Sequence, residues 1–205
     1  MGKRRLWYAA LALTAAGGIS NAFAADELSP WMVRVRLLDV VTERSNDAGG
    51  GIPADSLKVS GRLQPEVDVT YFFTRNIAAE LIATYPVSHT VDLNHGYIGS
   101  FQELPPTLNL QYHFDPVGRF TPYVGAGLAY MRTFNTSLVS GLGLTENNWG
   151  GDLQVGMDYQ IDKHWSFNAD LKKIWIDVGV TSGGSTVLNT HPDPYLVGVG
   201  VGYHF

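Results

Sequence analysis

Eight segments of this 205-residue chain alternate apolar and polar residues with a period of two. In residues 63–73, for example, Val67 and Val69 flank Asp68. Successive side chains of a β-strand point to opposite faces, so the pattern predicts strands with one apolar and one polar face. The eight segments are 31–38, 63–73, 77–87, 104–114, 122–131, 149–159, 165–175 and 195–205.

The connections between these segments alternate in length. The short ones are residues 74–76, 115–121 and 160–164. The long ones are rich in Gly, Ser and Asn and comprise residues 39–62, 88–103, 132–148 and 178–193. Short turns at one end and long loops at the other are typical of outer-membrane barrels. The predicted fold is therefore all-β, an eight-stranded antiparallel transmembrane β-barrel, with no domain boundary.

The first residues have the composition of an export signal. Three basic residues (Lys3, Arg4 and Arg5) precede an apolar stretch, and Ala22-Phe23-Ala24 resembles a cleavage site. We expect residues 1–24 to be a signal peptide and residues 25–205 to be the barrel. Without those three bases the chain has 11 Lys and Arg against 19 Asp and Glu, a net charge of −8. No basic patch suits nucleic acid, and a chain without cysteine depends on its backbone ladder and packing.

The distribution of aromatic residues indicates which face meets lipid. Fifteen of the 21 aromatic residues in 25–205 occupy apolar-face positions, most of them at strand ends, which predicts two belts at the membrane boundaries. The opposite face is charged and rich in glycine, which suits the narrow interior of an eight-stranded barrel. The alternative is a soluble, lipocalin-like barrel with its apolar face inward.

The polar face brings charged side chains into the interior near mid-depth. Isolated charges there are costly, so we expect them to neutralise one another in a bonded network. We favour a packed polar plug, and the alternative is an ion-conducting path. The predicted members of the plug are Arg34, Arg36, Glu66, Asp68, Glu80, Asp152, Asp170 and Lys172.

Toward the loop side the inward positions become apolar and predict a ligand pocket that opens outward. A concave apolar pocket with a few polar groups is the default expectation for a binding site. The alternative is that the barrel's own loops fill its mouth. The predicted pocket residues are Leu38, Ile82, Pro86, Met131, Ile174 and Leu196.

Two adjacent prolines, Pro105 and Pro106, stand at the start of the fourth segment. Neither can donate a ladder hydrogen bond, so they predict a gap in pairing with the third segment. We hypothesise that this gap is a lateral gate through which an apolar ligand leaves the pocket into the bilayer. The alternative is an ordinary strand start.

Several stretches together resemble the OmpW family of small outer-membrane proteins. They are "TYFFTRNIAAELIATYPVSH", "LPPTLNLQYHF", "PYVGAGLAY", "QVGMDYQIDKHW" and "DPYLVGVGVGYHF". The resemblance, which extends to AlkL-like relatives linked to alkane import, implies an eight-stranded barrel that takes up small hydrophobic molecules. Lys172 stands where some members carry a bulky apolar group, which favours sideways exit over a continuous apolar path to the periplasm.

Other function classes receive less support. The six histidines lack metal-ligand spacing, and Gly198, Gly200 and Gly202 precede no helix. We therefore expect no metal, no cofactor and no enzyme activity. A lipid-modifying site would need a pair such as His89 with Ser88 or Ser100 at the lipid–water boundary, and nothing specific in the sequence marks one. The expected partners are the lipid bilayer, lipopolysaccharide, small hydrophobic solutes and the outer-membrane assembly machinery. The alternative function is a structural barrel, or a surface receptor whose long loops bind external partners.

Overall fold

The computed structural model describes residues 28–42 and 45–205, so the predicted signal peptide lies outside the described residues. The described part is built from β-strands and one short 3-10 helix, η1 (Val139–Gly141). Among these residues, no helix is long and apolar enough to cross a membrane.

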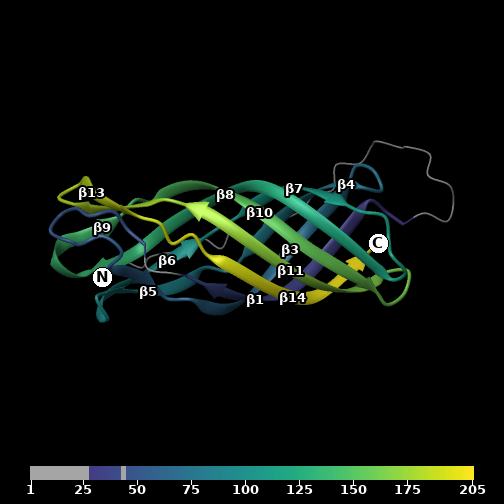
Figure 1. The fold of residues 1–205 in the computed structure, drawn as a ribbon, viewed down its shortest axis with the longest axis horizontal. Coiled ribbons are helices and arrows are strands. Elements are labelled where there is room, and N and C mark those ends of the chain that lie inside the picture. Colours follow the sequence, from purple (N-terminus) through teal and green to yellow (C-terminus); the bar gives the residue numbers. More distant parts are fainter. Residues whose placement is uncertain (1–27, 43–44) are drawn as a thin grey trace, which may run out of the picture.

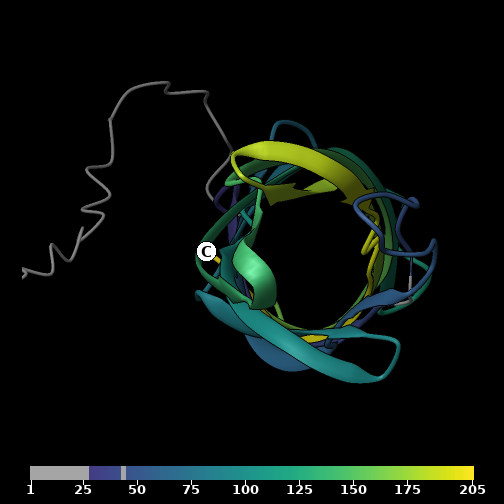
Figure 2. The same ribbon diagram turned by 90° about the vertical axis from the view of Figure 1, so that its left-hand side faces the viewer.

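Eight strands form the wall of a barrel and pair antiparallel with their neighbours (Figure 1). The last of them also pairs with the first, so that Val35 lies opposite both Val67 and Val201 and the ring closes (Figure 2). This confirms the predicted fold. The strands are β1 (Trp31–Val41), β3 (Arg62–Phe72), β4 (Ile77–Thr84), β7 (Thr107–His113), β8 (Phe120–Leu138), β10 (Asn147–Gln160), β11 (Trp165–Ile176) and β14 (Tyr195–His204).

Closure separates the two faces of each strand into two environments. In β1, Arg34 and Arg36 are 0% and 2% exposed, whereas Val35 and Leu37 are 50% and 47% exposed. A soluble protein shows the reverse arrangement, with charges outside and apolar residues inside. The apolar exterior therefore faces lipid, as the aromatic positions predict.

Aromatic side chains surround the barrel at both ends of its apolar exterior. On the turn side, the rings of Trp31 and Tyr71 lie 4.8 Å apart. On the loop side, the rings of Tyr130 and Trp149 also lie 4.8 Å apart. Such rings are amphipathic and are favoured at the membrane–water boundary, so they mark the two edges of the hydrocarbon layer.

Three of the four long connections, residues 88–103, 132–148 and 178–193, prove to be largely strands, which corrects the expectation of loops there. The loop side of the barrel is taken as its upper end. The upper part of β8 continues beyond the membrane and pairs with β6, which pairs in turn with β5. Alternating residues such as Val87, His89 and Val91 have a buried face to pack there, so the sheet extends past the bilayer. The additional strands are β2 (Leu57–Val59), β5 (Val87–Leu93), β6 (Gly96–Leu104), β9 (Leu142–Leu144), β12 (Val178–Ser182) and β13 (Ser185–Thr190).

The ladder between β4 and β7 has a gap where the two prolines predict one. Its last pair is Ile82 opposite Thr107, and pairing resumes above at Val87 opposite Glu103. On the other side, the Tyr130 N–H donates to the Pro106 carbonyl oxygen at 3.0 Å. The chain through the prolines therefore stays attached to β8 while it separates from β4.

An arginine on the exterior at mid-strand should destabilise the barrel far more than one in a turn. Val199 of β14 is 58% exposed and lies opposite Leu37 and Ala169, within the lipid-facing band. We expect Val199→Arg to lower the free energy of unfolding from phospholipid bilayers by about 2–4 kcal/mol. Val117→Arg, a matched change in the exposed turn before β8, should cost about 0–1 kcal/mol. Equal losses in denaturant titrations of the two variants would contradict the lipid-facing assignment.

Candidate functional site

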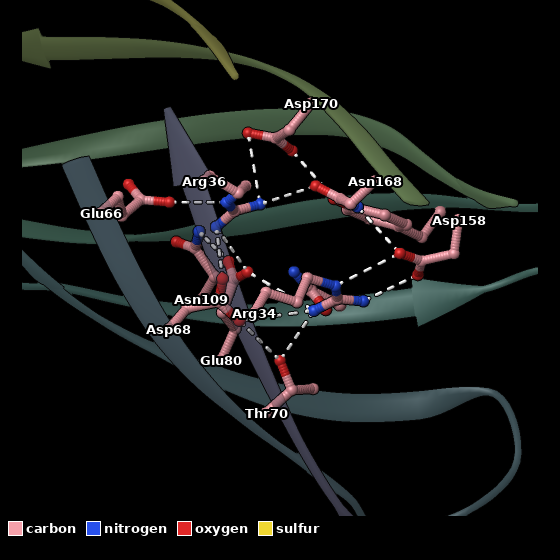
Figure 3. A network of polar contacts seen from close by, with 12 residues as sticks. Arg34, Arg36, Glu66, Asp68, Thr70, Glu80, Asn109, Asp158, Asn168 and Asp170 are labelled. Atoms are coloured by element: carbon pink, nitrogen blue, oxygen red, sulfur yellow. Dashed lines mark hydrogen bonds and ion pairs between the residues drawn. The ribbon is translucent and has the colours of Figure 1, made fainter. Parts of the chain in front are cut away.

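The centre of the site is a pair of arginines on the inner face of β1 (Figure 3). Arg34 reaches across the lumen to β10, where its Nη2 donates to Asp158 Oδ2 at 2.7 Å. Its Nη1 donates to Thr70 Oγ1 at 2.9 Å and lies 3.5 Å from Asp68 Oδ1. One side chain thus joins strands on opposite sides of the barrel.

Arg36, two residues further toward the loop side, forms the upper half of the same network. Its Nε donates to Glu66 Oε1 at 2.6 Å, and its Nη2 donates to Glu80 Oε1 at 3.0 Å. The same Nη2 lies 3.0 Å from Asp68 Oδ2, and Nη1 lies 3.7 Å from Asp170 Oδ1. Hydrogen bonds of this kind to ionised groups are the strong ones in a dry interior.

Neutral polar side chains that sequence reasoning missed complete the network. Gln154 Nε2 donates to Asp170 Oδ2 at 2.8 Å and to Glu80 Oε2 at 3.1 Å. The Tyr123 hydroxyl donates to Asp170 Oδ2 at 3.1 Å, and its ring is fully buried. Asp158, although charged, was also missed. The alternation could have found both residues, because Tyr123 has the same parity as the inward glycines of β8 and Asp158 has the same parity as Asp152.

Glycines make room for these side chains in the narrow lumen. A Cβ atom at Gly156 would lie 2.3 Å from the Tyr123 hydroxyl, and one at Gly127 would lie 1.8 Å from Asn109 Oδ1. Both distances are far below van der Waals contact. The inward glycines therefore allow large polar residues on neighbouring strands to fill the interior.

All eight predicted plug residues are buried, each at most 5% exposed. With Asp158, the buried charged residues of the described chain number three basic (Arg34, Arg36 and Lys172) and six acidic. Asp152 and Lys172 lie at the upper edge, where Lys172 is paired in register with Leu196. Because the bonds cross the lumen between distant strands, the arrangement favours a packed plug over an ion-conducting path.

An apolar cavity of about 80 Å³ lies above this plug. A single water needs roughly 10–15 Å³ of such space, so the cavity is large enough for a small organic molecule. One buried cluster packs around Leu38, Met131, Ile174 and Leu196 at its base. A second cluster from the extension strands packs above it and includes Leu57, Val91, Phe101 and Val180. The barrel's own extension strands thus continue the cavity's wall without filling the cavity.

Only some of the predicted pocket residues line the cavity. Met131, Ile174 and Leu196 line the cavity, and Leu38 packs in the cluster at its base. Pro105, predicted as part of the lateral gate, also lines the cavity. Ile82 is buried outside the cavity lining.

Pro86 is a correction, because it is exposed and does not line the cavity. The break in the strand at residues 85–86 shifts the inward positions from even to odd numbers. Val87 is therefore buried in place of Pro86.

Sequence reasoning also missed the cavity's upper wall. Ile98, Phe101 and Leu138 line it, but they fall within segments expected to be loops. The signal that could have found them is the short alternating pattern within 87–93 and 96–104.

One charged pair lies in the cavity wall beyond the loop-side belt. His89 is 2% exposed, its Nδ1 donates to the Ser60 carbonyl oxygen at 2.7 Å, and its Nε2 lies 3.1 Å from Glu103 Oε1. Burial opposes a charge on the ring, but the hydrogen bond and charge of Glu103 outweigh it, so the pKa of His89 is raised. Phe101 stacks on the ring with centroids 5.6 Å apart.

A closed eight-stranded barrel with an apolar exterior, aromatic belts and a polar interior is a bacterial outer-membrane protein. The OmpW family model matches residues 30–205, and the chain belongs to the OmpW family. This confirms the resemblance and the predicted location in the outer membrane. Because proteins of this family are non-enzymatic barrels, the chain is not an enzyme.

Individual relatives agree with this assignment. The uncharacterized outer-membrane protein y4mB of Sinorhizobium fredii is 44% identical over 191 residues, covering 87% of this chain and 81% of the relative. Outer membrane protein W of Escherichia coli is 30% identical over 220 residues, covering 98% and 100%. Outer membrane protein AlkL of Ectopseudomonas oleovorans is 27% identical over 170 residues, covering 78% and 74%. The crystal structure of OprG from Pseudomonas aeruginosa superposes with a TM-score of 0.75 at 26% identity, covering 87% and 97%.

Removal of Arg36 should strongly destabilise the barrel. Arg36→Leu leaves Glu66 and Glu80 buried without their main counter-charge, and such broken pairs cost about 3–5 kcal/mol. Arg119→Leu, the same change in an exposed turn, should leave stability within about 0.5 kcal/mol of the unaltered protein. Denaturant unfolding in bilayers measures both variants, and a small effect of Arg36→Leu would show that the network contributes little.

The ion pair of His89 with Glu103 should stabilise the extension most below neutral pH. Because folding raises the pKa of His89, its contribution is complete below the ordinary histidine value of about 6.5 and is lost as pH rises through the raised value. We expect His89→Gln to lower the thermal unfolding temperature more at pH 6 than at pH 9. Glu103→Gln should remove the same pH dependence. A loss that is equal at both pH values would contradict the charged pair.

Proposed function

We propose that this outer-membrane barrel takes up small hydrophobic molecules, which bind in the apolar cavity and leave sideways into the bilayer. The observation that carries the proposal is the position of the cavity, directly above a plug of buried charges and with Pro105 in its wall. Membership of the OmpW family and similarity to AlkL support an uptake role in general.

The plug makes a route straight through the barrel unfavourable for an apolar solute. Such a molecule would have to separate Arg36 from Glu66 and Glu80. It carries no polar group that could then bond to the arginine or to the two carboxylates. Breaking a buried ion pair in this way costs several kcal/mol. A solute that enters from outside is therefore expected to stop above the plug.

The gap between β4 and β7 offers the exit. Pro105 lines the cavity and has no N–H, and the ladder is interrupted between Ile82 and Val87 on the facing strand. Separating the strands at this point breaks no ladder hydrogen bond, because pairing has already ended. The exposed ring of Tyr85 lies beside the gap, so the exit is expected to open near the outer edge of the hydrocarbon layer.

The barrel's exterior contacts the lipid bilayer directly. Contact with lipopolysaccharide follows as a proposal from the outer leaflet of that membrane, and insertion by the outer-membrane assembly machinery is proposed from membership of this family of outer-membrane barrels. The solute itself is proposed only as a class, a small hydrophobic molecule.

Closing the gap should abolish uptake. We expect Pro105→Val combined with Pro106→Val to restore pairing with β4 and to reduce entry of a labelled alkane into proteoliposomes to the protein-free background. The matched control replaces Pro65 and Pro122, which lie within paired regions of β3 and β8, with valine and should retain uptake. Undiminished uptake by the first variant would refute the lateral gate. Absence of uptake by the unaltered protein would refute the channel itself and favour a structural or receptor role.

A further inference from the structure

The polar side chains in the cavity wall differ in whether their hydrogen-bonding groups are satisfied. The Thr42 hydroxyl donates to the Val59 carbonyl oxygen, and the Thr190 hydroxyl donates to that of Ser45 at 2.9 Å. His89 and Glu103 pair with each other. Gln64 is different, because its Oε1 atom is buried and, among the described residues, has neither a hydrogen-bond partner nor the charged neighbour that His89 Nε2 has in Glu103.

Gln64 stands at the boundary between plug and cavity. It is 5% exposed, lies opposite Leu38 in the β1–β3 ladder, and is two residues above Glu66 on the same face. A buried polar group without a partner costs about 1–3 kcal/mol. A ligand group that bonds to Gln64 recovers this free energy, whereas a purely apolar ligand does not.

We propose that the cavity prefers a neutral apolar molecule that carries one hydroxyl group, held by a hydrogen bond to the Gln64 amide at the cavity floor. This inference rests on the proposed function, whose solute it specifies. A hydroxyl both donates and accepts, so it satisfies either end of the amide. The remaining wall, with residues such as Val40, Ile98 and Leu144, would hold the apolar body.

The ligand should be uncharged because the surroundings of Gln64 are acidic. Glu103 lies in the cavity wall and Glu66 lies directly below. The plug beneath holds six acidic residues against three basic ones. A carboxylate in the cavity would meet this excess negative charge in a poorly solvated space.

Cyclohexanol and methylcyclohexane test the preference, because they have the same size and differ by a hydroxyl in place of a methyl group. Binding to the full barrel in lipid nanodiscs is measured for the unaltered protein, for Gln64→Met and for the control Gln160→Met at the opposite end. The quantity compared between proteins is the affinity for cyclohexanol divided by the affinity for methylcyclohexane, because each ligand's partition into lipid cancels in this comparison. We expect Gln64→Met to lower this ratio roughly 5- to 100-fold. Gln160→Met should leave the ratio unchanged, and cyclohexanecarboxylate should bind more weakly than cyclohexanol.

A second measurement needs no substitution. In the unaltered protein, saturating cyclohexanol should shift the NMR signals of the Gln64 side-chain amide, and methylcyclohexane should shift only the methyl signals of the cavity wall. The inference is overturned if both ligands shift the methyl signals and neither shifts the amide, or if the affinity ratio is the same with and without Gln64. In both cases the proposed uptake of apolar molecules stands. If neither ligand binds the unaltered protein, the proposed function fails as well.

Discussion

Backbone hydrogen bonding in hydrocarbon is the constraint on which the rest of this structure depends. Strands can cross a membrane only if every N–H and C=O has a partner, and pairing of β14 with β1 removes the last free edges. Closing the sheet with eight strands leaves a lumen only wide enough for side chains. The inward residues must therefore pack and bond with one another. Arg34, Arg36 and their carboxylate partners do so, and Gly156 makes room for Tyr123.

The same constraint bears on the proposed lateral exit, because it makes an interruption of the ladder conspicuous. Within the membrane the ladders are continuous, but pairing between β4 and β7 stops after Ile82, and the next pair toward the loops, Val87 with Glu103, belongs to β5 and β6. Tyr85 marks this level as the outer boundary of the hydrocarbon layer, where headgroups and water can satisfy free backbone groups. An apolar cavity, a charged plug below it and an interrupted β4–β7 ladder thus occur together near the outer membrane boundary. Their combination supports the proposed sideways release of a solute more strongly than any one of them.

Much of this arrangement was predictable because a strand has only two faces. The alternation around Val35 and Val67 placed the eight plug residues inside, and the aromatic positions placed the apolar face in lipid. The prediction was wrong where the local pattern changed. The break at residues 85–86 reversed which positions face inward, so Pro86 is outside and Val87 is inside. Strands β5 and β6 fall in a segment whose polar and glycine content predicts a loop, because that content conceals a short alternating pattern.

By itself, the sequence determined the number of strands in the barrel wall, their inner and outer faces and the charges enclosed, because side-chain alternation is a local property of an extended chain. The tertiary structure alone decided that Arg34 meets Asp158, 124 positions away in the chain, and that Gln154 joins Glu80 to Asp170. It also decided that the extension strands line a cavity and that Gln64 Oε1 has no hydrogen-bond partner among the described residues. These contacts join strands that are distant in sequence, and they depend on the register and curvature of the closed barrel, which no local pattern specifies.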